Sequence, residues 1–396
     1  MTQSVLGRLR RFWLDVHLWI GVGLFVVMVP LGVSGAFLVW HDQIDEIIHP
    51  QRFDVSKGGA TAAASVYLDA ARKAFGDRAA VTQIRLPAEP GRPVVASGRI
   101  AGQTLAPGQR PQSLTVWIDP ATGRVLDVAN TRKETINVMH RLHGSLWISA
   151  PGVGRKVVGW LGWAMSVSCL TGLWLWWPRN GAVLKALRWR RSPSTFNNLH
   201  HMVGFWVLIP LLLVSLTGVY ISFPETSHRV FGVGEASPRP MDKGPGGRPG
   251  GGGERGPNNA PPLATPQLPI DMAVAAAMAR QPGATLASIT LPTESRRPAW
   301  RIQFAGEGRV SPTTVQVADA DGSIRKGRGG GQAAPDPLSQ RMRRIHDAQE
   351  TPFIWQLLVF LTGVAPLLLG VSGTVMWLRR RSRRAHLKAP RTPPAE

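Results

Sequence analysis

Four long runs of this sequence contain no Asp, Glu, Lys or Arg, and they constrain its fold more than any other feature. They cover residues 18–40, 157–177, 202–223 and 353–378. Each is long enough to cross a bilayer core of about 30 Å as a helix, and tryptophans gather near their ends, as is typical of the lipid–water interface. The first run is too long for the apolar core of a signal peptide, and no small-residue cleavage site follows it. The sequence predicts an α-helical membrane protein with four transmembrane helices, the first one retained.

Basic residues predict how these helices are oriented. They gather at the N-terminus (Arg8, Arg10 and Arg11), in the acid-free loop at 178–201 and in the tail at 379–396. All three segments lie on one side if the helices alternate, so the positive-inside rule predicts a multi-pass protein of the bacterial inner membrane with both termini in the cytoplasm. A net charge of +22 could also indicate nucleic-acid binding. We assign it instead to orientation and to attraction toward anionic membrane lipids, and expect no nucleic-acid partner.

The two long segments between the spans repeat one order of predicted elements. Each begins with an amphipathic helix, continues through three strand-like runs, and passes an acidic turn before a fourth run. The two turns read DPATG at 119–123 and DADG at 319–322. Gly/Pro-rich stretches in the second segment are typical of flexible linkers. We therefore expect two periplasmic α+β domains, joined to the four transmembrane helices.

The spans repeat as well. A shift of 183 residues aligns His17 with His200, and SGAF at 34–37 with TGVY at 217–220. Such an internal two-fold repeat favours a shared site between the halves. The predicted order is a cytoplasmic N-terminus with the first span (1–40), a first periplasmic domain (41–156), the second span (157–177), a cytoplasmic loop (178–201), the third span (202–223), a second periplasmic domain (224–352), the fourth span (353–378) and a basic cytoplasmic tail (379–396).

Four of the ten histidines follow this repeat. His17 and His200 begin the first and third spans at the predicted cytoplasmic face, and His143 and His346 precede the second and fourth spans at the periplasmic face. Two b-type haems need this arrangement, because each iron takes one neutral imidazole from either side of the porphyrin. A polar role at the interface explains any one histidine, but not four that are paired by both repeat and membrane level. His201 could act in place of its neighbour His200.

Glycine and cysteine residues limit which cofactors the predicted site could hold. Gly21 and Gly204 lie four residues after His17 and His200, on the same helix face. They leave room either for a flat macrocycle or for close helix packing, and their spacing does not choose between the two. The single cysteine, Cys169, excludes an internal disulfide and a four-cysteine iron–sulfur cluster. No C-x-x-C-H motif occurs, which excludes c-type haem, and no span carries the charged residue that ion transporters usually place there.

The combined motifs resemble the PepSY-associated transmembrane helix family. They are H-x-x-x-G opening the odd spans, a [ST]-G pair in every span, LHGSLW at 142–147 and the DPATG turn. Within that family the chain is most similar to the FoxB type of iron-regulated inner-membrane ferrisiderophore reductases. This resemblance implies two haem b groups per chain, with His17, His200, His143 and His346 as axial ligands of the iron, and a ferric siderophore as substrate.

The predicted activity is a ferric-siderophore reductase that passes electrons across the membrane. Reduction suits iron release, because hard oxygen donors hold Fe³⁺ better than the softer Fe²⁺. The sequence carries no flavin or nicotinamide motif, so we expect a quinol or a protein as electron donor. The alternative is a non-enzymatic PepSY-domain membrane protein that regulates envelope proteolysis or senses iron, since family membership does not fix function.

Overall fold

The computed structural model describes residues 5–56, 61–103, 112–178, 192–231, 260–306, 313–325 and 337–388. The chain divides into two compact units, each assembled from separated segments. A membrane unit comprises Met1–His41, Met139–Glu235 and Asp336–Glu396, and a sheet unit comprises Asp42–Val138 and Ala236–Pro335. The expected Gly/Pro-rich linkers and most of the loop at 178–201 lie outside the described residues.

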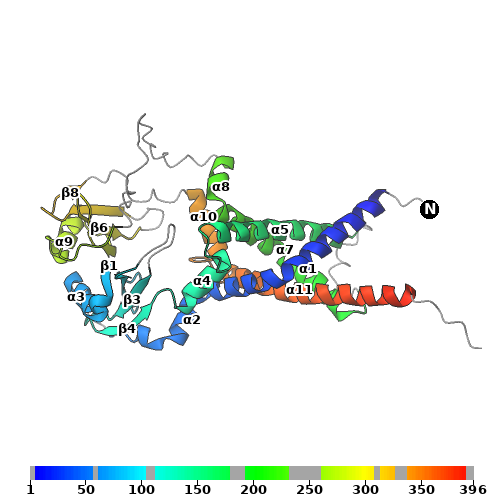
Figure 1. Ribbon diagram of the computed structural model, residues 1–396, viewed down its shortest axis with the longest axis horizontal. Coiled ribbons are helices and arrows are strands. Elements are labelled where there is room, and N and C mark those ends of the chain that lie inside the picture. Colours follow the sequence, from blue (N-terminus) through cyan, green and yellow to red (C-terminus); the bar gives the residue numbers. More distant parts are fainter. Residues whose placement is uncertain are drawn as a thin grey trace, which may run out of the picture. The chain divides into compact units, whose positions relative to one another are not determined.

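Four long helices make up most of the membrane unit (Figure 1). They are α1 (Val5–Val39), α5 (Val153–Trp176), α7 (Thr195–Ser222) and α11 (Phe353–Lys388). All four are long and apolar enough to cross a membrane, which confirms the four predicted spans. The helices α1 and α7 begin before the apolar runs, because the polar turns ahead of each run continue the helix. His17 and His200, expected at the first turn of a span, therefore lie further inside their helices.

The four helices pack as a bundle in which α1 and α7 each contact both α5 and α11. Gly32 of α1 and Gly363 of α11 face each other so closely that a Cβ on either would overlap the carbonyl group of the other. Small residues permit such close backbone approach in membranes, where packing rather than water exclusion holds helices together.

Three short helices complete the described part of this unit. They are α4 (Thr135–Ser145), α8 (Pro224–Val230) and α10 (Pro337–Asp347). The unit boundary at Met139 falls within α4, and α10 packs against α7. The sheet unit thus covers fewer residues than the predicted domains at 41–156 and 224–352. The residues just before α5 and α11 belong to the membrane unit instead.

The sheet unit contains one eight-stranded antiparallel sheet in the order β4-β3-β2-β1-β5-β6-β7-β8. The strands are β1 (Ala79–Arg85), β2 (Val94–Ile100), β3 (Ser113–Ile118), β4 (Val125–Asn130), β5 (Leu286–Thr290), β6 (Ala299–Phe304), β7 (Thr313–Ala318) and β8 (Ile324–Arg325). Its helices are α2 (His41–Ile48), η1 (Pro50–Phe53), α3 (Ala64–Phe75), η2 (Gly76–Arg78) and α9 (Ile270–Arg280). All eight predicted strands are confirmed.

The two expected soluble domains form this single unit together. Strands β1 and β5 pair antiparallel, with Ile84 opposite Ile289, so that two four-stranded meanders become one sheet. Helices α3 and α9 contact each other and share one apolar core with both meanders, in which Phe75 and Trp300 are buried. Burying each such side chain contributes roughly 1.5–3 kcal/mol or more. Both meanders therefore contribute to one continuous core.

Both acidic turns hold their half of the sheet unit in the same way. Asp119 is 0% exposed and accepts hydrogen bonds from the backbone and hydroxyl of Ser56. Asp319, 3% exposed, accepts from the backbone of Gln267 and from the indole nitrogen of Trp300. A buried carboxylate needs such donors. Each turn thereby fixes the segment that leads into its helix.

Candidate functional site

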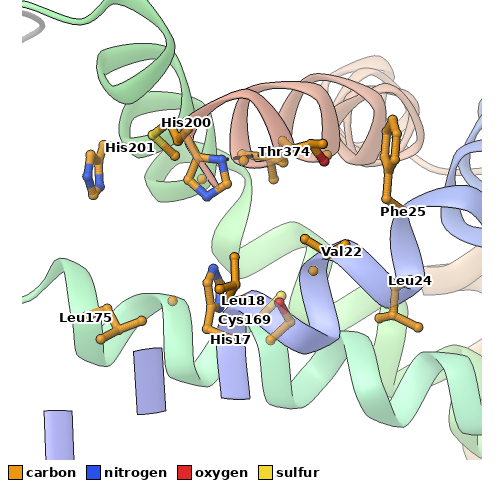
Figure 2. A pocket seen from close by; sticks show the side chains of 18 of the residues that line it. His17, Leu18, Val22, Leu24, Phe25, Cys169, Leu175, His200, His201 and Thr374 are labelled. Atoms are coloured by element: carbon orange, nitrogen blue, oxygen red, sulfur yellow. Dashed lines mark hydrogen bonds between the residues drawn. The ribbon is translucent and has the colours of Figure 1, made fainter. Parts of the chain in front are cut away.

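His17 of α1 and His200 of α7 face each other inside the bundle. Their ring centroids are 6.3 Å apart and the ring planes cross at 88°. Figure 2 shows the two rings projecting toward one another, while His201 lies away from His17. The structure therefore brings His200, rather than His201, to His17.

His143 of α4 and His346 of α10 form a second pair, with ring centroids 6.0 Å apart and planes inclined at 46°. Both side chains reach from short helices onto transmembrane helices, as their hydrogen bonds show. The structure thus brings together the two pairs that the repeat predicts. That these histidines bind iron stays a prediction.

Each of the four rings uses Nδ1 to bond a neighbouring transmembrane helix. The contacts are His17 to Thr171 Oγ1 (3.0 Å), His200 to Leu369 O and Ser372 Oγ (both 3.1 Å), His143 to Leu31 O (2.9 Å), and His346 to Val214 O (3.0 Å) and Thr217 Oγ1 (3.1 Å).

These bonds fix which nitrogen carries the proton. A carbonyl oxygen only accepts, so Nδ1 of His143, His200 and His346 is the donor and Nε2 keeps its lone pair. The Thr171 hydroxyl donates to the carbonyl of Val167 and so accepts from His17 in the same manner. Within the described residues, no hydrogen bond occupies any of the four Nε2 atoms. Metal-binding histidines usually have this arrangement, with one nitrogen anchored and the other free.

A glycine lies against each of the four rings, directly after a Ser or Thr. A Cβ at that position would lie 3.2 Å from Cε1 of His17 (Gly172), 3.3 Å from that of His200 (Gly373), 2.8 Å from that of His143 (Gly35) and 3.0 Å from that of His346 (Gly218). We call each Ser/Thr–Gly pair with its ring an imidazole cradle. Sequence reasoning recognised the [ST]-G pairs as a motif but missed this role. One available signal was spacing, because Gly35 and Gly218 each lie eighteen residues after His17 and His200.

A cavity of about 620 Å³ surrounds the His17–His200 pair and is lined by all four long helices. This is an ordinary volume for a cofactor site. Gly21 and Gly204 line it, and a Cβ on Gly21 would meet nothing within 4 Å. At Gly21 the glycine therefore leaves space rather than permitting close helix packing, whereas a Cβ on Gly204 would lie 3.7 Å from Cδ2 of Leu369. Cys169 of α5 also lines the cavity.

Burial keeps the second pair neutral. It lowers the pKa of His143 to about 4, with a further contribution from the neighbouring His346, whose own pKa burial also lowers. Only a neutral imidazole offers a lone pair to a metal. At pH 7 both side chains are in the form that a metal ligand requires.

The backbone turns sharply after each of the two short histidine helices. Leu146 and Trp147 follow α4 with φ values of 51° and 58°, and Ala348 and Glu350 follow α10 with 56° and 52°. Such left-handed conformations cost non-glycine residues of order 1–3 kcal/mol each and occur where the surrounding structure requires them. Here they lie in the connections between each short helix and the transmembrane helix after it.

His41 and His140 form a third close pair, with centroids 6.1 Å apart. It lacks the features of the other two. Nδ1 of His41 bonds the carbonyl of Leu38, only three residues earlier in the chain, and none of the described glycines places a Cβ within 4 Å of either ring. Proximity alone does not make a cradle.

Among the described residues of the sheet unit, Asp45, His49 and Glu134 form a cluster of possible metal ligands. Its centre is already taken by a cation. The buried Arg52 donates to Asp45 (3.1 Å), Glu134 (2.7 Å) and Asp127 (2.6 Å). A guanidinium held by three carboxylates is a structural ion-pair network, and it ties α2 and η1 to the sheet.

Four membrane-spanning helices with paired, cradled histidines define an integral membrane protein with two candidate metal-ligand sites. Residues 14–380 match the family model described as PepSY-associated TM region, and the chain belongs to that family. A similar protein is the uncharacterized protein PA4219 of Pseudomonas aeruginosa, 25% identical over 288 residues, which are 62% of this chain and 64% of that relative. The chain thus spans less than two thirds of the curated relative that it matches.

Proposed function

We propose that the protein is a di-haem b-type oxidoreductase of the bacterial inner membrane that delivers electrons to a ferric siderophore in the periplasm. The fourfold imidazole cradle is the observation that carries this proposal. When bound, haem supplies a one-electron redox centre at each of the two levels. His17, His200, His143 and His346 would ligate the iron, and their Nδ1 hydrogen bonds fix the imidazole tautomers.

The residues fit a metal held between two imidazoles. A histidine nitrogen lies about 2 Å from a bound metal, so two ligating nitrogens on opposite sides stand about 4 Å apart. Ring centroids lie further out by the radius of each ring, in agreement with the observed 6.3 Å and 6.0 Å. The Nδ1 bonds make each Nε2 a better electron donor, and the glycines of the cradles let each ring pack directly against its transmembrane helix.

Charge supports the proposed orientation of the two pairs in the membrane. Under the positive-inside rule, the basic ends of α1 and α11 favour a cytoplasmic level for His17 and His200, and hence a periplasmic level for His143 and His346. A quinol or a protein is the proposed electron donor. The ferric siderophore as acceptor rests on the resemblance to ferrisiderophore reductases.

Haem quantitation tests the proposal. Two ligand pairs would hold two haems per chain, and each would be low-spin because its iron would take two imidazole ligands. A pyridine haemochrome assay on purified protein should give two haem b groups per chain. A result of one haem or none would contradict the proposal that all four histidines bind haem. The regulatory or iron-sensing function would then be favoured.

Single substitutions test the pairing. His143→Ala or His346→Ala should remove one spectral component, and His17→Ala or His200→Ala the other. His140→Ala and His201→Ala serve as controls that keep both. Loss of the same component in His17→Ala and His143→Ala would contradict the two-level arrangement.

A further inference from the structure

The cavity around His17 and His200 is apolar at one end and charged at the other. Its apolar end is lined by Phe25, Met28, Leu211 and Pro366, and its opposite end by Asp15, Asn197, Arg380 and Arg381. Helices α1, α7 and α11 each contribute residues to both ends, so the polarity changes along these helices.

The charged end begins just beyond the histidine pair. Asp15 lies two residues before His17, and Arg380 lies seven residues after Gly373, the cradle glycine of His200. Seven residues are two helical turns, or about 10 Å. A flat ligand centred between the two rings would therefore extend one edge toward the arginines.

Only some of the basic residues of this helix end line the cavity. Arg380 and Arg381 do, and the guanidinium of Arg381 lies 5.8 Å from the ring of Trp377, which also lines the cavity. Arg379 instead packs over Phe196 at 5.0 Å. If these arginines served only to orient the helix in the membrane, their charge alone would be enough. That role does not explain why two of them line the cavity.

We propose that Arg380 and Arg381 bind the two propionate carboxylates of the haem held by His17 and His200. This inference rests on the proposed function and adds the orientation of the group. Haem b is an apolar macrocycle with both carboxylates on one edge, which matches a cavity with one apolar and one doubly cationic end. A carboxylate withdrawn from water needs a partner, and arginine binds carboxylates with two parallel hydrogen bonds. Asp15 offsets one of the two positive charges, so the end keeps a net positive charge.

The experiment compares two double variants of the full-length holoprotein in nanodiscs. Arg380→Gln/Arg381→Gln removes the proposed partners, and Arg379→Gln/Arg383→Gln removes the same charge from the same helix end. Haem loss to a haem scavenger should become at least about tenfold faster for one haem in the first variant, as loss of charge-assisted hydrogen bonds implies. The midpoint potential of that haem should fall, because nearby positive charge favours the reduced iron. The control variant should match the wild type.

A modified haem supplies the second arm. Haem dimethyl ester lacks the carboxylate charges, so the wild type should bind it more weakly than haem, whereas the Arg380→Gln/Arg381→Gln protein should bind both equally. Equal preference for haem in wild type and variant would overturn the proposal.

Anionic lipid headgroups share the chemistry of the propionates. If the substitutions act only in phosphatidylglycerol nanodiscs and not in phosphatidylcholine, the arginines bind headgroups and the proposal fails. Equal haem loss in the two double variants would also overturn it, as a general effect of charge. A wild-type protein without haem would instead contradict the proposed function itself.

Discussion

Histidine 143 and histidine 140 lie one turn apart on α4, yet only the first is held like a metal ligand. Nδ1 of His143 is anchored on the carbonyl of Leu31, and Gly35 leaves space for its ring. The ring of His140 instead lies beside that of His41, and no described glycine accommodates it. What surrounds an imidazole, rather than its distance from the membrane, distinguishes the four candidate ligands.

Gly35→Ala should displace the His143 ring, because the new Cβ would lie 2.8 Å from its Cε1. We expect weaker binding or loss of one haem with the other retained, measured by haem quantitation and redox titration. Gly144→Ala is the matched control, since its Cβ meets nothing within 4 Å. Unchanged haem binding in Gly35→Ala would show that this cradle does not position a ligand.

The Thr171 hydroxyl should contribute to haem binding through His17. It accepts a hydrogen bond from Nδ1 of His17 at 3.0 Å. Thr171→Val should therefore lower haem affinity by about tenfold or more, whereas Thr171→Ser, which keeps the hydroxyl, should not. Haem transfer rates measure both. An equal loss in the two variants would mean that the hydroxyl is not the anchor.

The stability of strands β6 and β7 should depend on the acidic turn that contains Asp319. Asp319→Ala removes the acceptor of the buried Trp300 indole and should destabilise the sheet unit by about 1–3 kcal/mol, the cost of a buried unsatisfied donor. Asp321→Ala in the same turn is the control, because Asp321 is exposed. Hydrogen exchange of β6 and β7 in the full-length protein should be faster in the first variant alone. Equal protection would contradict this role for Asp319.

The elements themselves were largely predictable, because apolar runs without charge and alternating strand patterns are local signals. Pairing between distant segments was not. Ile84 and Ile289 are opposite each other, but nothing in either strand specifies a partner some two hundred residues away. The histidine pairs followed from the repeat. The cradles did not, since a Ser-Gly or Thr-Gly pair in a membrane helix equally indicates helix packing.

At the scale of the whole molecule, two helices connect the two histidine pairs. Helix α1 carries His17 at one pair and Gly35 at the other, and α7 carries His200 and Gly218 likewise. Eighteen residues of helix span about 27 Å, so a single haem cannot serve both faces of the membrane. Under the proposed function, electron transfer needs both sites.

His346→Ala should consequently stop the reduction of a ferric siderophore while the other haem stays reducible by dithionite. The measurement mixes reduced protein with a ferric siderophore and traps Fe²⁺ with a chelator. His140→Ala, which lies nearby but outside the cradles, should react like the wild type. Release of Fe²⁺ at the wild-type rate from the His346→Ala protein would place the exit site elsewhere.

The eighteen-residue spacing also limits how this chain can change in length. Eighteen residues are five full turns of 3.6 residues, so His17 and Gly35 lie on one face of α1. A one-residue deletion between them would rotate Gly35 by about 100° around the helix axis relative to His17. Gly35 would then no longer face the ring of His143. Substitutions within the interval leave this phase intact, whereas insertions and deletions do not. Residues 17–35 and 200–218 should therefore tolerate many substitutions but almost no insertion or deletion.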